Sequence, residues 1–339
     1  MSGRDPEEEA RVSTPLELLY DLTFAVAFGT AAEQLAHYLA LDHIRTAIIG
    51  FLFGAFAICW AWVNYSWFAS AYNNDDWITR LLTMVQMIGV IVLALGLQRM
   101  FESVDRGGSL QNGVMVGGYV VMRVGMLLLW ARAARHDEAR RRIAKTYIWA
   151  ISISQTGWVL LAVAQLPVAT SLALATLLLL VELAGPWIAE RKKGSGGTPW
   201  HPHHIAERYG LLVIITLGEG IIGTVAALNA VVHGPQGWSL NAALVALAGV
   251  SLTFALFVLW ISVAGDRDPF HFALLAAAAA LLLLSVLLAS WGVAMAVCLV
   301  VLACAPIVTV VGFETIGYRH LSEVMKRTHA HGISSGRRN

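Results

Sequence analysis

Apolar residues fill this chain in long blocks that are hydrophobic all round when wound as a helix. Blocks such as 48–62, 211–232 and 274–288 contain almost no charge. A helix needs about twenty such residues to cross a hydrocarbon core of roughly 30 Å. Barrel strands would instead alternate polar and apolar residues over about ten positions, and these blocks do not alternate. The pattern predicts an all-α fold, a polytopic transmembrane helix bundle.

Charges, glycines and prolines at the ends of the blocks predict about ten spanning helices. We expect them at 16–39, 46–71, 80–100, 111–132, 146–165, 169–189, 206–230, 239–264, 271–289 and 292–314. Merging the last two, which only a tight turn separates, would give nine. The same pattern predicts a disordered cytoplasmic tail over 1–14, the helix bundle over 15–318 and a basic cytoplasmic tail over 319–339.

Composition supports a membrane location and excludes several functions. Charged residues make up only 13% of the chain, against about 25% in soluble proteins. A net charge of +1 gives no field that would favour nucleic acid. The chain has no Gly-x-x-x-x-Gly-Lys-Ser/Thr loop, so we expect no ATP-driven transport and no cofactor. Expected partners are membrane lipids and a small-molecule or lipid-like substrate, and the oligomeric state stays unknown.

Lysine and arginine in the short loops predict the orientation, because they favour the cytoplasmic side of the membrane. The loops after the even-numbered helices are basic, and so is the C-terminal tail; the cations are Arg132, Arg135, Arg140, Arg141, Arg142, Lys145, Arg191, Lys192, Lys193, Arg208, Arg319, Lys326, Arg327, Arg337 and Arg338. The opposite loops hold little beyond Arg45 and Arg106. We therefore expect a multi-pass protein of the bacterial inner membrane with both termini in the cytoplasm, which requires an even helix count.

Acidic residues cluster in the first and seventh predicted helices. Asp21 and Glu33 are twelve residues apart in the first, and Glu207 and Glu219 are twelve apart in the seventh. The seventh helix follows the first by six helices, so the two cross the membrane in the same direction. Their equal spacing of acids therefore suggests a parallel internal repeat. Ionisable groups at membrane depth are costly, so they pair inside the bundle or mark a pathway.

Two explanations of these acids remain open. They could hold the bundle together by pairing with Arg123, Arg208 or His37. Alternatively, they line a polar cavity that binds or relays protons or cations, which would make the protein a proton- or cation-coupled transporter of an unknown small solute. The predicted cavity contains Asp21, Glu33, His37, Glu207, Arg208 and Glu219.

Further polar and aromatic residues lie deep in other predicted helices and are candidates for a pocket lining. They are Trp60, Trp62, Arg123, Gln155 and Glu182. The arginine needs a carboxylate partner at that depth, and the tryptophans can stabilise a cation by their ring faces. A second hypothesis is therefore a membrane-embedded enzyme that uses a buried carboxylic acid on a lipid or isoprenoid. A third is a membrane stress-adaptation protein without turnover.

Three histidines precede the seventh helix, at His201, His203 and His204. With Glu207 one turn further on, they could supply nitrogen and oxygen ligands to zinc. No second His or Cys pair completes a familiar spacing, so we predict no metal site.

At these positions the chain resembles the bacterial low-temperature-requirement protein A (LtrA) family of integral membrane proteins. The resemblance rests on Pro15-Leu-Glu17-x-x-x-Asp21-Leu-x-Phe24 with Gln34-Leu-Ala-His37, and on His204-x-x-Glu207-Arg208-x-Gly210-Leu with Leu217-Gly218-Glu219. It covers residues 15 to about 230. It implies the helical membrane fold and a role for Glu17, Asp21, His37, His204, Glu207, Arg208 and Glu219, and it implies no substrate.

Overall fold

The structure is a computed structural model that describes residues 12–72, 74–191, 197–233, 237–265, 276–277, 280–281, 284–285, 288, 291 and 293–312. It divides into two compact units, Met1–Thr216 and Leu217–Asn339, and each is described by itself. The described residues are helical, apart from loops and one isolated β-bridge between Ser109 and Pro167. The all-α fold is thereby confirmed.

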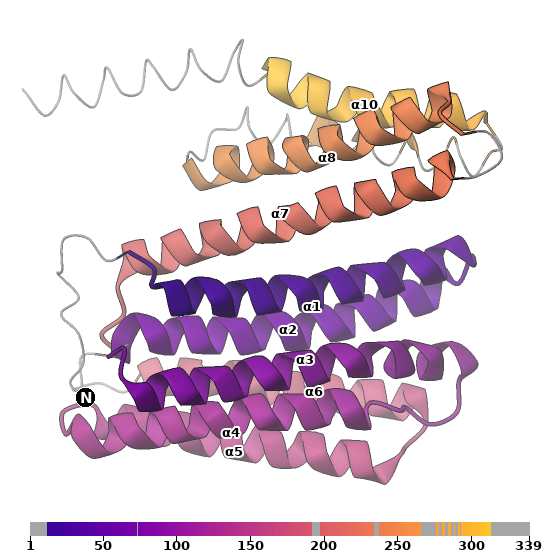
Figure 1. Ribbon diagram of the computed structural model, residues 1–339. Helices are drawn as coiled ribbons and strands as arrows, with labels where there is room; N and C mark the ends of the chain where they lie inside the picture. Colours follow the sequence, from indigo (N-terminus) through magenta and orange to yellow (C-terminus); the bar gives the residue numbers. More distant parts are fainter. Residues whose placement is uncertain are drawn as a thin grey trace, which may run out of the picture. The chain divides into compact units, whose positions relative to one another are not determined.

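Six long helices make up most of the first unit and lie alongside one another (Figure 1). They are α1 (Pro15–Ala40), α2 (Ile44–Tyr72), α3 (Trp77–Arg106), α4 (Gly113–His136), α5 (Arg141–Ala164) and α6 (Val168–Glu190). Helix α7 (Pro202–Val232) begins in the first unit. The predicted ranges agree with these helices, and most observed helices extend a few residues further into the polar loops.

Capping residues explain where several helices begin and end. Thr14 and Glu17 form a reciprocal capping box at the start of α1, with Pro15 in its first turn. The side chain of Asp76 accepts a hydrogen bond from the backbone N–H of Thr79 and so caps α3. That helix ends at Gly107, whose φ of 71° an L-residue rarely adopts.

Helices α3 and α4 pack most closely, because glycines let their backbones approach. A Cβ added at Gly96 would lie 2.3 Å from the backbone nitrogen of Met115. One added at Gly118 would lie 2.3 Å from the backbone nitrogen of Leu93. Small residues are therefore required at these crossing points.

Six helices in the described part have the length and apolar composition to cross a membrane: α2 to α6, and Pro202–Ala226 of α7. Helix α1 is not among them, since Glu17, Asp21 and Glu33 lower its hydropathy. The protein is thus a multi-pass membrane protein, while ten spans and the internal repeat stay predictions.

In the second unit, α8 (Leu240–Gly265) packs on α10 (Met295–Gly312). The second half of α7 also meets α8, because a Cβ at Gly220 would lie 2.9 Å from Oγ1 of Thr253. The predicted helix at 271–289 falls largely outside the described residues. So do most of the predicted N-terminal tail and all of the tail at 319–339.

Candidate functional site

The first turns of α1 and α7 face one another through two pairs of ionisable side chains. Glu17 and Asp21 are four residues apart on α1, and His204 and Arg208 are four apart on α7. Residues at this spacing lie one above the other on a helix face. Glu17 meets His204, and Asp21 meets Arg208, so the two helix starts run in the same direction.

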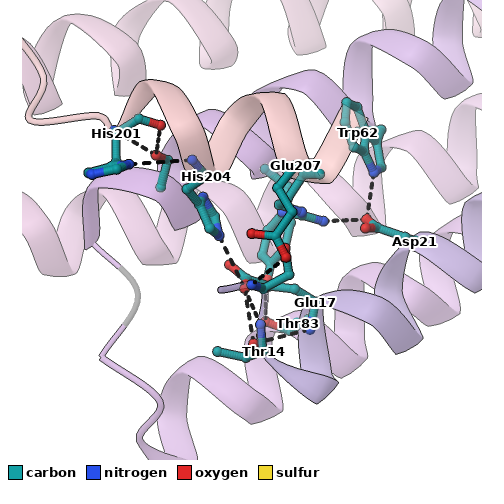
Figure 2. A network of polar contacts seen from close by, with 12 residues as sticks. Thr14, Glu17, Asp21, Trp62, Thr83, His201, His204 and Glu207 are labelled. Carbon is teal, nitrogen blue, oxygen red and sulfur yellow. Dashed lines mark hydrogen bonds and ion pairs between the residues drawn. The ribbon is translucent and has the colours of Figure 1, made fainter. Parts of the chain in front are cut away.

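Glu17 and His204 point toward one another between α1 and α7 (Figure 2). The side chains of both pairs are shielded from solvent. Nε2 of His204 lies 3.3 Å from Oε2 of Glu17, and Nη2 of Arg208 donates to Oδ1 of Asp21. All four side chains are 0% exposed. The indole Nε1 of Trp62 also donates to Oδ1 of Asp21, at 2.6 Å. Burying charges this completely is expensive unless each is compensated, so the pairing fixes α7 against α1 and α2.

Aromatic rings enclose the arginine of this network. The Arg208 guanidinium carbon lies 5.4 Å from the ring centroid of Trp62 and 5.5 Å from that of Tyr65. These distances allow a cation–π attraction. Tyr65 is held in turn by a 3.0 Å hydrogen bond to Thr83 and by its ring contact with Tyr20. The ring of Tyr65 is therefore positioned by contacts of its own.

Several polar atoms of the network are buried and make no hydrogen bond among the described residues. They are Oδ2 of Asp21, Nδ1 of His204, and Nε and Nη1 of Arg208. A buried donor or acceptor without a partner costs about 1–3 kcal/mol. The network therefore keeps capacity for a water molecule, a proton or an ion.

A second buried charge pair joins α4 to α6. Nη2 of Arg123 lies 3.2 Å from Oε2 of Glu182, and both side chains are almost fully buried. Tyr119 donates to Oε2 of Glu182 at 2.6 Å, and Trp158 donates to Oε1 at 3.1 Å. From the sequence, several carboxylates were candidates for the partner of Arg123. In the structure its partner is Glu182.

The other predicted cavity residues lie in different places. Glu33 is exposed and lines a crevice of about 550 Å³ formed by α1 and α3. His37 is exposed near the end of α1. Glu207 is partly buried and accepts a hydrogen bond from the backbone N–H of Ser13 at 3.3 Å. Glu219 belongs to the second unit and is partly buried.

Trp60 and Gln155, predicted to line a pocket, differ in their surroundings. Trp60 lines a pocket of about 270 Å³ together with Trp67 and Tyr147. Gln155 is buried, and neither of its amide atoms makes a hydrogen bond in the described part of the chain.

The three histidines at the start of α7 have separate environments: His201 directly precedes the helix, and His203 and His204 lie in its first turn. His201 accepts a hydrogen bond at Nδ1 from the backbone N–H of His204, while His203 is exposed. His204 turns toward Glu17. No group of three His, Cys, Asp or Glu side chains within the described ranges could hold a metal ion.

The sequence did not predict the pairing of Glu17 with His204. It also did not predict the hydrogen bonds that Tyr119 and Trp158 donate to Glu182. The equal four-residue spacing of Glu17 and Asp21 and of His204 and Arg208 was the signal that could have matched the two helices. Nothing in the sequence distinguishes Tyr119 and Trp158 from other membrane aromatics.

Comparisons with known proteins give one family. The model of the family described as "Bacterial low temperature requirement A protein (LtrA)" matches residues 12–268, further toward the C-terminus than the motifs alone suggested. A protein of Rhizobium meliloti (strain 1021), described as uncharacterized, is 28% identical over 225 residues. That match covers 65% of this chain and 52% of the relative, so the chain spans about half of the relative's length. No solved structure matches.

Proposed function

The chain belongs to the bacterial low temperature requirement A (LtrA) family, and we propose that it is a secondary transporter that couples a small solute to protons or cations. In this proposal it lies in the bacterial inner membrane with both termini in the cytoplasm. The observation that carries the proposal is the doubly paired, solvent-shielded network between α1 and α7. Two adjacent buried acid–base pairs are costly for a purely structural contact, since apolar packing of the same volume would serve as well.

A proton can switch such a network. A proton that binds Asp21 removes the negative charge opposite Arg208 and leaves the guanidinium buried without compensation. A proton that moves from a cationic His204 to Glu17 neutralises both groups and replaces their ion pair by a neutral hydrogen-bonded pair, and histidine is well suited to such exchange. Either event weakens the hold of α1 on the start of α7. Oδ2 of Asp21 can accept an incoming proton or a hydrogen bond from water, and the unpaired N–H groups of Arg208 can donate to water or an anion.

The crevice along α1 provides a second acidic position. Its lining extends on α1 from Leu22 to Gln34 and includes Thr30 and Glu33, and α3 contributes Gln98. Its volume of about 550 Å³ admits a small polar solute or a hydrated cation. Twelve residues of helix between Asp21 and Glu33 correspond to about 18 Å. Helix α1 therefore carries both a solute-accessible carboxylate and the carboxylates that bind α7.

Transport by the purified full chain in liposomes tests the proposal. The assay follows internal pH with a trapped dye, under imposed gradients and with a panel of small solutes added in turn. We expect coupled proton movement with at least one solute, and its loss in His204→Gln, which breaks the network, and in Glu33→Gln, which removes the acid of the crevice. The matched control is Glu138→Gln, whose side chain is 84% exposed beside the loop after α4. Absence of proton or solute movement across the panel, or full activity in Glu33→Gln, would refute the proposal.

The enzyme hypothesis has one observation in its favour. An apolar pocket lies beside the buried carboxylate Glu182, with Tyr119 and Trp158 between them. However, both Glu182 oxygens accept hydrogen bonds, and Arg123 compensates the charge. A carboxylate that accepts hydrogen bonds at both oxygens and faces an arginine makes a poor general acid. Extraction of lipids after incubation with the protein distinguishes the two functions, since only an enzyme changes their composition.

A further inference from the structure

Helices α2 and α6 leave an apolar pocket between them that the α1–α7 network does not use. This pocket, called here the chain pocket, has a volume of about 290 Å³. Phe53 and Phe56 of α2, Tyr119 of α4, Trp158 of α5, and Leu172 and Ala175 of α6 form part of its wall. Among the described helices, α2 and α6 form no extensive contact with each other.

The wall presents carbon rather than polar atoms to the chain pocket. Tyr119 and Trp158 are its two large amphipathic side chains, and both direct their polar atoms to Glu182. The one threonine in the lining, Thr176, donates its hydroxyl back to Leu172 of its own helix. An occupant of the chain pocket therefore needs an apolar chain of its own.

A second cavity adjoins the chain pocket at Ile49 and Leu172, which line both. This head cavity has a volume of about 550 Å³, and Arg45 and Arg106 lie in its wall. Backbone hydrogen bonds from Leu110 to Leu166 and from Val168 to Gly108 join the two loops at its edge. The two loops at the edge of the cavity are therefore joined to each other.

The charges of the head cavity favour an anion. Its one carboxylate, Asp105, is already engaged by Thr46 at 3.0 Å and His43 at 2.7 Å. Arg106 pairs with Glu102 on its own helix. Arg45 contacts no carboxylate within the described part of the chain, so it is the cation that remains for a ligand. A guanidinium that has no carboxylate partner is well suited to bind a phosphate, because its N–H groups can donate to two phosphate oxygens.

We propose that the two cavities together bind one anionic phospholipid, with an acyl chain in the chain pocket and the phosphate beside Arg45. An apolar pocket that continues into a basic cavity matches a ligand with a hydrocarbon chain and an anionic end. Membrane phospholipid surrounds these helices and has this chemistry.

Fluorescence quenching by brominated lipid tests the binding. The full chain is purified in a neutral detergent and titrated with phosphatidylglycerol brominated at mid-chain, then with phosphatidylcholine brominated at the same carbons. Trp158 lies in the wall of the chain pocket, so we expect saturable quenching that Trp158→Phe reduces. We expect phosphatidylglycerol to bind more tightly, and Arg45→Gln to weaken its binding about five-fold. Arg99→Gln, a change at an exposed arginine outside the lining, should leave the affinity unchanged.

Filling the chain pocket tests the position of the acyl chain. Ala175→Phe places a ring in the pocket and should abolish the saturable quenching. If the larger side chain lowers the folded yield, Ala175→Leu is the smaller substitution that makes the same test. Ala173→Phe is the matched control, because Ala173 is exposed on the same helix and outside the pocket. Equal affinities for the two lipids, or quenching that survives both Ala175 variants, would overturn the proposal.

Discussion

Asp21 accepts two hydrogen bonds at a single oxygen, one from Trp62 and one from Arg208. Its charge is what makes the buried guanidinium tolerable. Removal of one member of a buried pair costs about 3–5 kcal/mol, whereas replacement of both by apolar residues is often close to neutral.

We therefore expect Asp21→Asn to destabilise the protein by about 3 kcal/mol. The double variant Asp21→Leu with Arg208→Met should be more stable than Asp21→Leu alone or Arg208→Met alone, because no uncompensated charge remains in it. The variants are compared by thermal unfolding in detergent. Each sample is heated, and the amount of protein that remains monodisperse is measured. A double variant that loses the sum of the two single losses would show that the residues act independently.

At the scale of the helix, the packing of α3 on α4 depends on glycine at particular positions. A Cβ at Gly118 would lie 2.3 Å from the backbone nitrogen of Leu93 and 2.5 Å from the carbonyl oxygen of Gly89. These are backbone atoms, so the helices would have to separate. We expect Gly118→Ala to cost about 1–3 kcal/mol.

The neighbouring glycine provides the control, since a Cβ at Gly117 would meet no atom within 4 Å. Gly117→Ala should be neutral or slightly stabilising, because alanine has the higher helix propensity. Melting temperatures of the two variants, measured side by side, decide the matter. An equal loss in both would mean that helix propensity rather than close packing governs this position.

The start of α3 depends on Asp76 in two ways, as the helix cap and as the partner of Arg132. The hydrogen bonds from Arg132 hold the pKa of Asp76 below its ordinary value, against the opposing effect of desolvation. The pKa of Asp76 is lower in the folded protein than in the unfolded chain, where it is about 3.9. The charge of Asp76 therefore stabilises the fold fully above that pH, and this stabilisation is lost as the pH falls through the lower pKa of the folded state.

Asp76→Asn keeps a capping oxygen and removes the charge, so we expect a loss of up to about 1 kcal/mol at neutral pH. Asp76→Ala also removes the cap and should cost about 1 kcal/mol more. The difference between wild type and Asp76→Asn should be constant from pH 5 to 8 and should shrink below about pH 4. Unfolding measured across this pH range checks the sign, and a difference that grows on acidification would contradict it.

At the scale of the whole molecule, the parallel starts of α1 and α7 bear on topology. Because Glu17 meets His204 and Asp21 meets Arg208, residues near Thr14 and near Pro202 lie at the same end of the first unit. This agrees with the predicted placement of the N-terminus and the basic residues Arg191 to Lys193 on one side of the membrane.

We expect a reporter fused after Asn339 or inserted within 135–145 to be cytoplasmic, and one inserted near Gly107 to be external. The physical reason is the excess of lysine and arginine on the predicted cytoplasmic side. Paired alkaline phosphatase and fluorescent protein fusions measure both locations. An external C-terminus would show that the region 271–314 contains an odd number of spans.

The sequence by itself determined the helical membrane fold and most helix ranges, because long apolar blocks and their polar ends act locally. Thr14 with Pro15 at the start of α1 was predictable for the same reason. The motif residues Glu17, Asp21, His204 and Arg208 were recognisable from the family resemblance.

Only the tertiary structure decided which charges pair. The choice of Asp21 for Arg208 and of Glu182 for Arg123 depends on helix rotation and distance across the bundle, which a single sequence does not encode locally. The same holds for the chain pocket, since Phe53, Tyr119 and Ala175 lie on three helices and become its wall only when those helices pack. Helix formation follows from neighbouring residues, whereas pairing and cavities follow from contacts between residues far apart in the chain.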